Sequence, residues 1–281
     1  MNKSISKNIL SKYGYKIFLR SWSTDRPPSH NILIIHGLGE HSGRYDEFAN
    51  FFLKKNIGVF AFDLVGHGKS EGVKGHVSKI QNFIDDIEEV LIIIRKKYID
   101  TPIVLFGHSL GGCLTLNYLI ERKSKEINSA IVSSSWIITE VKLPKYLLRF
   151  QHILGVIFPR LRLSNRLNPN DLSKDAEIVK NYINDPYVHD RISLNLFKEV
   201  NKGIKKIKKE VYKLNLPILL THGKKDKIIS YKGSELLNKK IPHSKLKIFE
   251  NIFHEPHNDL EKKEVLNLYF DFISLVKVNN F

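Results

Sequence analysis

Short apolar runs alternate along the chain with longer segments whose apolar residues recur at helical spacing. The apolar runs predict strands at residues 32–35, 59–63, 103–106, 130–133, 218–221 and 245–249, and a pair of short strands is expected at 16–22. The segments between them predict helices at 42–55, 78–98, 112–125, 230–240 and 259–277. Because most strand runs have apolar centres, we expect a mostly parallel sheet that helices cover on both faces. This alternation predicts a doubly wound α/β fold.

The alternation stops between about residue 137 and residue 216. This stretch contains four prolines, has no clear strand, and mixes apolar with basic residues. It is too long for a plain loop in a compact domain. We therefore expect a helical cap, inserted after the sixth strand and lying over the strand ends. The whole chain, 1–281, is assigned to a single domain, because α/β domains of roughly this length are common.

The charge balance is strongly basic, with 45 Lys and Arg against 29 Asp and Glu, a formal net charge of +16. Such a charge suits nucleic acid or anionic lipid. Lysine is abundant along the whole chain, however, and its densest cluster, 202–213, alternates with apolar residues as in an amphipathic helix. A solvated helix face and a face that contacts lipid headgroups both fit this cluster. No nucleic-acid-binding motif accompanies the charge, so we expect no nucleic-acid partner.

The sequence shows no recognisable targeting signal, and we therefore expect a cytoplasmic protein. Residues 1–10 are polar and lysine-rich, unlike a signal peptide, and the nearest candidate for a membrane span, 146–158, is short and interrupted by polar residues. Peripheral contact with a membrane surface through the cap is left open, as is the oligomeric state. The one cysteine, Cys113, cannot form an internal disulfide and is expected to be buried.

The candidate chemistry begins at the run Gly107-His108-Ser109-Leu110-Gly111, which follows a predicted strand and precedes a predicted helix. G-x-S-x-G in this context is typical of a nucleophile elbow, a tight turn that presents a serine hydroxyl above the sheet. The amide of Leu110 would lie at the start of the helix, where unpaired N–H groups favour an oxyanion. We therefore predict Ser109 as a nucleophile.

A serine nucleophile needs a base and an orienting acid, which follow it along the chain in this type of fold. Asp226 lies just beyond the strand at 218–221 and is the predicted acid. His254 and His257 both follow the last strand. We favour His254 as the base, and expect a structural or surface role for His257.

A second oxyanion donor is expected from the glycine-rich loop that follows the strand at 32–35, with the amide of Leu38 as the best candidate. His108 is expected to point away from Ser109, and His222 to have no catalytic role. No H-x-x-x-H pair accompanied by a carboxylate occurs, so we predict neither a metal site nor a cofactor.

Several stretches resemble the α/β-hydrolase superfamily, in its monoacylglycerol lipase and lysophospholipase branch of serine-aminopeptidase-like hydrolases. They are residues 36–45, 63–72 and 107–112, the cap segments 172–175 and 184–186, and the segments of the predicted acid and base, 223–226 and 253–254. The resemblance implies an α/β-hydrolase fold, a triad of Ser109, Asp226 and His254, an oxyanion hole from Leu38 and Leu110, and a cap lining an acyl tunnel. It also implies that Glu40 and Arg44 orient structure or a polar headgroup.

The function expected from these residues is a serine esterase that cleaves single-acyl lipids, monoacylglycerols or lysophospholipids, through an acyl-enzyme. A short-chain carboxylesterase or a proline iminopeptidase-like peptidase would use the same triad. A non-catalytic ligand-binding protein is a further alternative, although such relatives commonly lose a triad member. Acyl-chain length, headgroup and positional preference depend on the shape of the cap and stay open.

Overall fold

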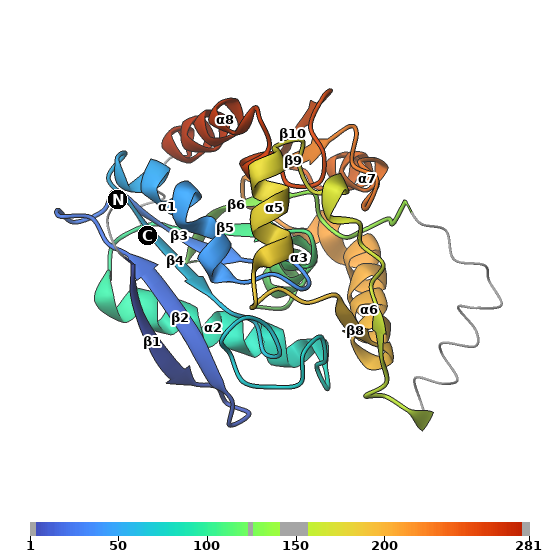
Figure 1. The fold of residues 1–281 in the computed structure, drawn as a ribbon. Coiled ribbons are helices and arrows are strands. Elements are labelled where there is room, and N and C mark those ends of the chain that lie inside the picture. Colours follow the sequence, from blue (N-terminus) through green and yellow to red (C-terminus); the bar gives the residue numbers. More distant parts are fainter. Residues whose placement is uncertain (1–3, 123–125, 141–156, 277–281) are drawn as a thin grey trace.

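A computed structural model of the protein describes residues 4–122, 126–140 and 157–276 (Figure 1). Its strands are β1 (Ile5–Leu10), β2 (Lys16–Trp22), β3 (His30–Ile35), β4 (Ile57–Phe62), β5 (Ile103–His108), β6 (Ile127–Ser133), β7 (Arg162–Ser164), β8 (Arg191–Ser193), β9 (Ile218–Gly223) and β10 (Ser244–Phe249). Its α-helices are α1 (Asp46–Leu53), α2 (Ile80–Lys97), α3 (Leu110–Arg122), α5 (Ala176–Asn184), α6 (Leu194–Glu210), α7 (Lys232–Lys240) and α8 (Lys262–Leu275). Short 3-10 helices are η1 (Ser42–Tyr45), η2 (Pro169–Asp171), η3 (Val211–Lys213) and η4 (Pro256–Asn258).

The described residues form a central sheet of eight strands in the order β1-β2-β4-β3-β5-β6-β9-β10. The first two pairs, β1 with β2 and β2 with β4, are antiparallel, and every other pair is parallel. Strands β4 and β5 are buried at every position, as expected where helices cover both faces of a parallel sheet. The predicted mostly parallel sheet with flanking helices is confirmed.

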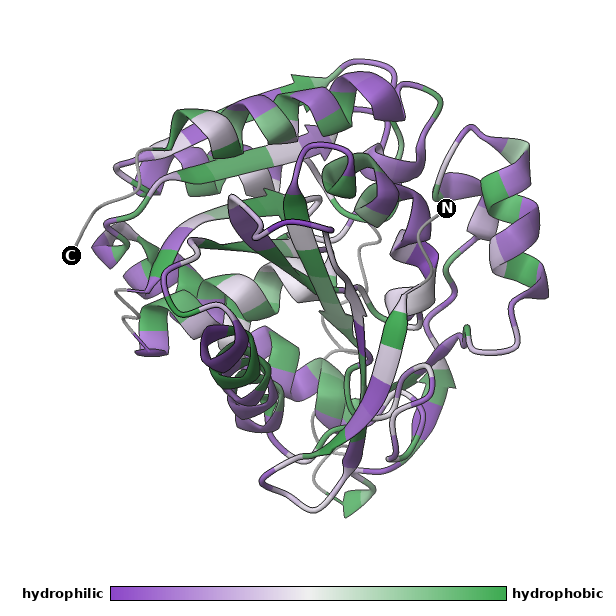
Figure 2. Cartoon of the chain, turned by 90° about the vertical axis from the view of Figure 1, so that its left-hand side faces the viewer, coloured by the Kyte–Doolittle hydropathy of each residue, from purple (hydrophilic) through white to green (hydrophobic). Residues whose placement is uncertain are grey.

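Two hydrophobic clusters lie on the two faces of the sheet. Helices α1 and α8 contribute aromatic side chains such as Phe48, Phe52 and Tyr269 to one cluster, whereas α2, α3 and α6 pack their apolar faces into the other. Figure 2 shows central strands that are largely hydrophobic and helices that carry both hydrophobic and hydrophilic residues. The sheet is therefore a rigid base, and the loops at its ends are free to carry polar residues.

The N-terminal strands differ from the prediction of two short strands within 16–22, which was wrong. Residues 16–22 form the single strand β2, and its partner is β1 at residues 5–10. Five of the six residues of β1 are exposed, because this strand is at the edge of the sheet. An exposed edge strand has no apolar pattern by which its sequence could be recognised.

The insertion between β6 and β9 is more regular than the sequence indicated. The expectation of no strand was wrong, since β7 and β8 form a small antiparallel pair, but three residues each are too few to produce a periodicity. The basic helix expected at 202–213 is the longer helix α6, whose N-cap Ser193 accepts a hydrogen bond from the Leu196 amide. Residues 141–156, which include most of the apolar segment 146–158, lie outside the described residues. The assignments of one domain and of a cap stay predictions.

Two further expectations can be compared with the fold. Cys113 is buried in α3. In the described part of the chain, no helix is both long enough and apolar enough to cross a bilayer.

Candidate active site

Ser109 occupies the turn between β5 and α3 in a backbone conformation that few L-residues adopt. Its φ angle is +53°, in the left-handed region, and 8 % of the residue is exposed. Helix α3 then passes so close to the sheet that a Cβ atom on Gly111 would lie 1.9 Å from the carbonyl oxygen of Ile35. The predicted turn is therefore present, and its glycine is needed because no side chain fits there.

His254 lies in the loop after β10 and reaches the serine. Its Nε2 atom is 3.1 Å from Ser109 Oγ, and its Nδ1 atom is 2.7 Å from Asp226 Oδ2. All three side chains are buried in loops at the carboxyl ends of β5, β9 and β10. The structure thus brings together the alcohol, imidazole and carboxylate that the sequence singled out.

Asp226 is held as a carboxylate by several donors. Its Oδ1 atom accepts hydrogen bonds from the amides of Ile228 and Ile229, at 2.8 and 2.9 Å. Burial alone would raise the pKa of Asp226, but the charge of His254 and the hydrogen bond from His222 outweigh it, so the pKa is held well below its usual range. The acid is therefore ionised at neutral pH.

The His254 imidazole shows the complementary effect. Burial acts to lower its pKa, whereas the charge and hydrogen bond of Asp226, with smaller contributions from Glu255 and Glu40, raise it above the ordinary value of 6.5. A histidine with a raised pKa is a stronger base toward a bound hydroxyl. The pair is thus arranged to accept the proton of Ser109.

His222, for which the sequence indicated no catalytic role, is a partner of the predicted acid. Its Nε2 atom is 3.0 Å from Asp226 Oδ2, and its Nδ1 atom is 2.8 Å from the hydroxyl of Ser234. The sequence signal for this contact was a histidine near the end of a buried strand, four residues before the acid. It contacts the same oxygen of Asp226 as His254 does, and within the described chain it makes no hydrogen bond to Ser109.

The candidate oxyanion donors lie next to the serine. Leu110 is the first residue of α3, and the loop that carries Leu38 passes so close that a Cβ atom on Gly37 would be 3.3 Å from Ser109 Cβ. Within the described ranges, neither amide donates a hydrogen bond to another protein group. Their role in binding an oxyanion stays a prediction.

His108 and His257 complete a buried group of rings beside the site. The ring of His108 is 4.9 Å from those of His254 and His257, and His257 stacks on Tyr45 at 5.1 Å. Burial lowers the pKa of each of these two histidines to about 3, so both rings are neutral. His257 is thus structural and buried, not a surface residue, and His108 packs its ring against those of His254 and His257.

The insertion between β6 and β9 directly contacts the loop after β3, which carries Leu38. The amide of His189 donates to the carbonyl of Gly39 at 2.9 Å, and His41 Nε2 lies 2.8 Å from Asp185 Oδ2. A Cβ atom on Gly39 would lie 2.2 Å from the His189 carbonyl oxygen. The loop after β3 therefore makes close backbone contact with the segment before β8.

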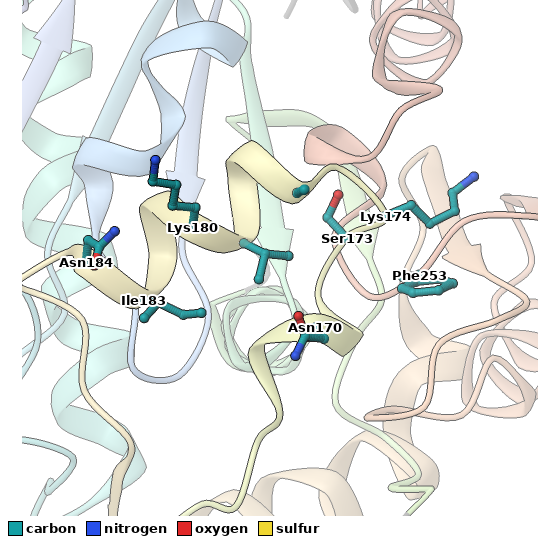
Figure 3. A pocket seen from close by; sticks show the side chains of 9 residues that line it. Asn170, Ser173, Lys174, Lys180, Ile183, Asn184 and Phe253 are labelled. Atoms are coloured by element: carbon teal, nitrogen blue, oxygen red, sulfur yellow. The ribbon is translucent and has the colours of Figure 1, made fainter.

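A hollow of about 510 Å³ lies between α5 and the loop that carries the candidate base (Figure 3). Its lining includes the apolar side chains of Val179, Ile183 and Phe253 and the cations of Lys174 and Lys180, and no carboxylate is among the lining residues that the structure describes. Phe253 is adjacent to His254 in the chain. No cluster of three or more metal-ligating side chains occurs among the residues that the structure describes.

Comparison with known proteins identifies the family. The sequence model described as serine aminopeptidase, S33, matches residues 26–261. The chain belongs to this family. This chain is 34 % identical over 276 residues to an uncharacterized abhydrolase domain-containing protein of Dictyostelium discoideum. The match covers 97 % of this chain but only 29 % of the length of that relative.

Two monoacylglycerol-hydrolysing proteins are also similar to this S33 chain. Monoglyceride lipase of Rattus norvegicus is 29 % identical over 256 residues, which cover 90 % of this chain and 84 % of the rat protein. The crystal structure of Paleococcus ferrophilus monoacylglycerol lipase superimposes with a TM-score of 0.83 at 33 % identity, covering 92 % of this chain and 98 % of that one. The α/β-hydrolase fold that the sequence predicted is confirmed.

Proposed function

We propose that this protein is a serine hydrolase that cleaves carboxylic esters of single-acyl lipids, such as monoacylglycerols or lysophospholipids, through an acyl-enzyme. The observation that carries the proposal is the unbroken series of contacts from Ser109 Oγ through His254 to Asp226, at 3.1 and 2.7 Å. The similarity to two monoacylglycerol lipases supports the choice of ester.

The reaction follows from this geometry. His254 Nε2 accepts the proton of Ser109 as Oγ attacks the ester carbonyl, and the carbonyl oxygen becomes an oxyanion that the amides of Leu38 and Leu110 bind. The imidazolium, stabilised by ionised Asp226, returns the proton to the departing alcohol. Water, deprotonated by His254, then attacks the acyl-enzyme, and Ser109 leaves with the proton as the fatty acid is released. No cofactor takes part in these steps.

The lining of the hollow bears on the choice between ester and peptide. An aminopeptidase must bind a positively charged α-amino group, for which a carboxylate is the natural partner. The described lining of the hollow beside the His254 loop instead carries Lys180, and Lys174, which also lines it, is paired with Glu261 at 2.6 Å. This favours esters with neutral or anionic headgroups over peptides with a free amino terminus.

Labelling with a fluorophosphonate tests the nucleophile. The wild-type protein should be labelled, and Ser109→Ala should abolish both labelling and ester hydrolysis. Ser129→Ala is a matched control, because Ser129 is also buried but its hydroxyl has no hydrogen-bond partner within the described chain. A folded wild-type protein that is not labelled would favour the ligand-binding alternative.

A substrate panel tests the ester. Rates on a monoacylglycerol, a lysophosphatidylcholine, a short-chain ester and a proline arylamide separate the alternatives. We expect the first two to be hydrolysed with the highest kcat/KM. A preference for the arylamide would overturn the lipid assignment, and a preference for the short ester would indicate a carboxylesterase.

Contact with a membrane surface is a finer part of the proposal. At the edge of the insertion, Ile157, Phe158, Leu161 and Leu163 expose between 44 and 61 % of their area, and they alternate with exposed Arg160 and Arg162. Apolar side chains flanked by cations suit the interface of an anionic bilayer. Cosedimentation with anionic vesicles should weaken in Phe158→Ser and with salt, but not in Leu10→Ser, an even more exposed apolar position on β1. Equal binding by both variants would exclude this surface.

A further inference from the structure

A buried ion cluster lies beside the candidate base. Arg44 Nη1 and Nη2 donate to the two carboxylate oxygens of Glu255 at 2.6 and 2.8 Å, and Nη1 also donates to Glu40 Oε2 at 3.0 Å. All three side chains are less than a tenth exposed. We name Glu40, Arg44 and Glu255 the Arg44 cluster.

The Arg44 cluster joins the two loops on which the reaction depends. Glu40 Oε1 accepts the amide of Gly37 at 2.6 Å, so one end of the cluster fixes the loop that carries Leu38. Glu255 directly follows His254, so the other end fixes the loop of the base. The ring of Tyr182, from α5, covers the Arg44 guanidinium at 4.8 Å. The cluster is therefore shielded from water, and charges interact more strongly in such a low-dielectric environment.

Stability alone does not account for such a cluster. Removing charged groups from water costs several kcal/mol per ion, roughly, and buried ion pairs often contribute little net stability. Two carboxylates share one guanidinium here, so the cluster carries a net negative formal charge. That excess charge lies next to an imidazole that becomes positive during the reaction.

The other groups that face His254 do not supply this charge. Asp226, in the loop after β9, is the direct hydrogen-bond partner of His254. His108, at the end of β5, and His257, in η4, are neutral because burial lowers the pKa of each to about 3. Among the described residues, Glu255 and Glu40 are the anions that follow Asp226 in raising the pKa of His254 against the effect of burial.

We propose that the Arg44 cluster is a positioning unit that holds the His254 loop against the Leu38 loop and favours the imidazolium formed when Ser109 attacks. The inference rests on the serine hydrolase function proposed above. It assigns Glu255 and Glu40 as positioning residues, which act through His254 and do not touch the substrate.

The test compares Glu255→Gln and Glu40→Gln with the wild-type protein. Each substitution keeps the size of the side chain and removes one negative charge. Glu250→Gln is the matched control, because Glu250 lies only four residues before His254 but its side chain is 69 % exposed in a surface pair with Lys224. The pH profile of kcat/KM is measured with a soluble nitrophenyl ester, whose leaving group needs no protonation, alongside fluorophosphonate labelling.

Both glutamine variants should show two changes together. The acid limb of the profile moves to lower pH, because His254 loses a neighbouring anion and is protonated less readily. The plateau falls about tenfold, which corresponds to about 1.4 kcal/mol of the activation barrier. Glu250→Gln should show neither change. Should Glu255→Gln fail to fold, by circular dichroism, Glu40→Gln provides the same test.

The contrary outcomes are distinct. A labelled wild-type protein whose folded glutamine variants keep the wild-type acid limb would overturn the role of the Arg44 cluster and leave the proposed function intact. A purely structural role would reduce the plateau or the melting temperature without moving the limb. A wild-type protein that is neither labelled nor active would overturn both proposals.

Discussion

The loops at the strand ends and the insertion between β6 and β9 are built in different ways. In the strand-end loops, Ser109, Asp226 and His254 are buried and each has its hydrogen-bond partners in the protein. In the insertion, all three residues of β7 are exposed, and so are the apolar side chains just before it. The comparison indicates that the site residues are held by partners within the protein, whereas this edge of the insertion presents its side chains to solvent.

The sharpest test of this comparison replaces the base. His254→Ala should lower kcat/KM by roughly four to six orders of magnitude, because the serine loses its proton acceptor. His257→Asn should cost less than about tenfold, since His257 has no hydrogen-bond partner in the described chain and contributes ring packing. Ester hydrolysis by the two purified variants gives the result, and equal losses would show that the base is misassigned.

The rigidity of the elbow can be broken at Gly111. Gly111→Ala places a methyl group 1.9 Å from the Ile35 carbonyl oxygen, which belongs to a central strand that cannot yield. We expect a loss of roughly 3 kcal/mol in the free energy of unfolding. Gly14→Ala, whose new methyl group meets nothing within 4 Å, should lose only the roughly 1 kcal/mol of its left-handed φ. Denaturant unfolding would measure both, and similar losses would contradict this view of the elbow.

The pH dependence of kcat/KM should reflect a histidine of the strand-end loops and not a histidine of the insertion. Catalysis requires neutral His254, whose pKa is raised above 6.5, so kcat/KM should fall about tenfold per unit as the pH drops below a limb placed above 6.5. In the insertion, burial lowers the pKa of His189 to about 4, so that residue stays neutral through the same range. An acid limb below pH 6 would show that the Asp226 pair does not control the base.

The smallest effect is expected from the insertion. Ile183→Ser removes an apolar side chain from the lining of the hollow, but 60 % of that side chain is exposed already. We expect kcat/KM to fall about threefold for long acyl chains and to be unchanged for short ones. Ile99→Ser, at an exposed position between α2 and β5, is the control. An equal decrease for both chain lengths would exclude the hollow as an acyl contact.

The sequence was most informative where a local rule permits few solutions. The glycines around Ser109 signal a turn in which the chain approaches the sheet too closely for a side chain, and the buried strands appear as apolar runs. The acid could be located because it must follow a particular strand. Asp226 and His254 were thus identified through the topology of the sheet and not through their immediate neighbours.

Other features lack such a signal. The edge strand β1 is exposed and has no apolar pattern, and β7 and β8 depend on each other across 26 residues of chain for their pairing. The contacts of His222 with Asp226 and of Arg44 with Glu255 are made by side chains in the folded molecule. Arg44 and Glu255 are 211 positions apart, so no local rule joins them.

The backbone contact between Gly39 and His189 has a mechanical consequence. Because a hydrogen bond and a steric fit join these two residues, an outward swing of residues 185–193 would drag the neighbouring amide of Leu38 with it. Sequence changes that reshape this part of the insertion would then alter turnover as well as substrate preference. The hydrogen bond between His189 and Gly39 and the pair of His41 with Asp185 thus tie the loop of Leu38 to the segment before β8 at two points.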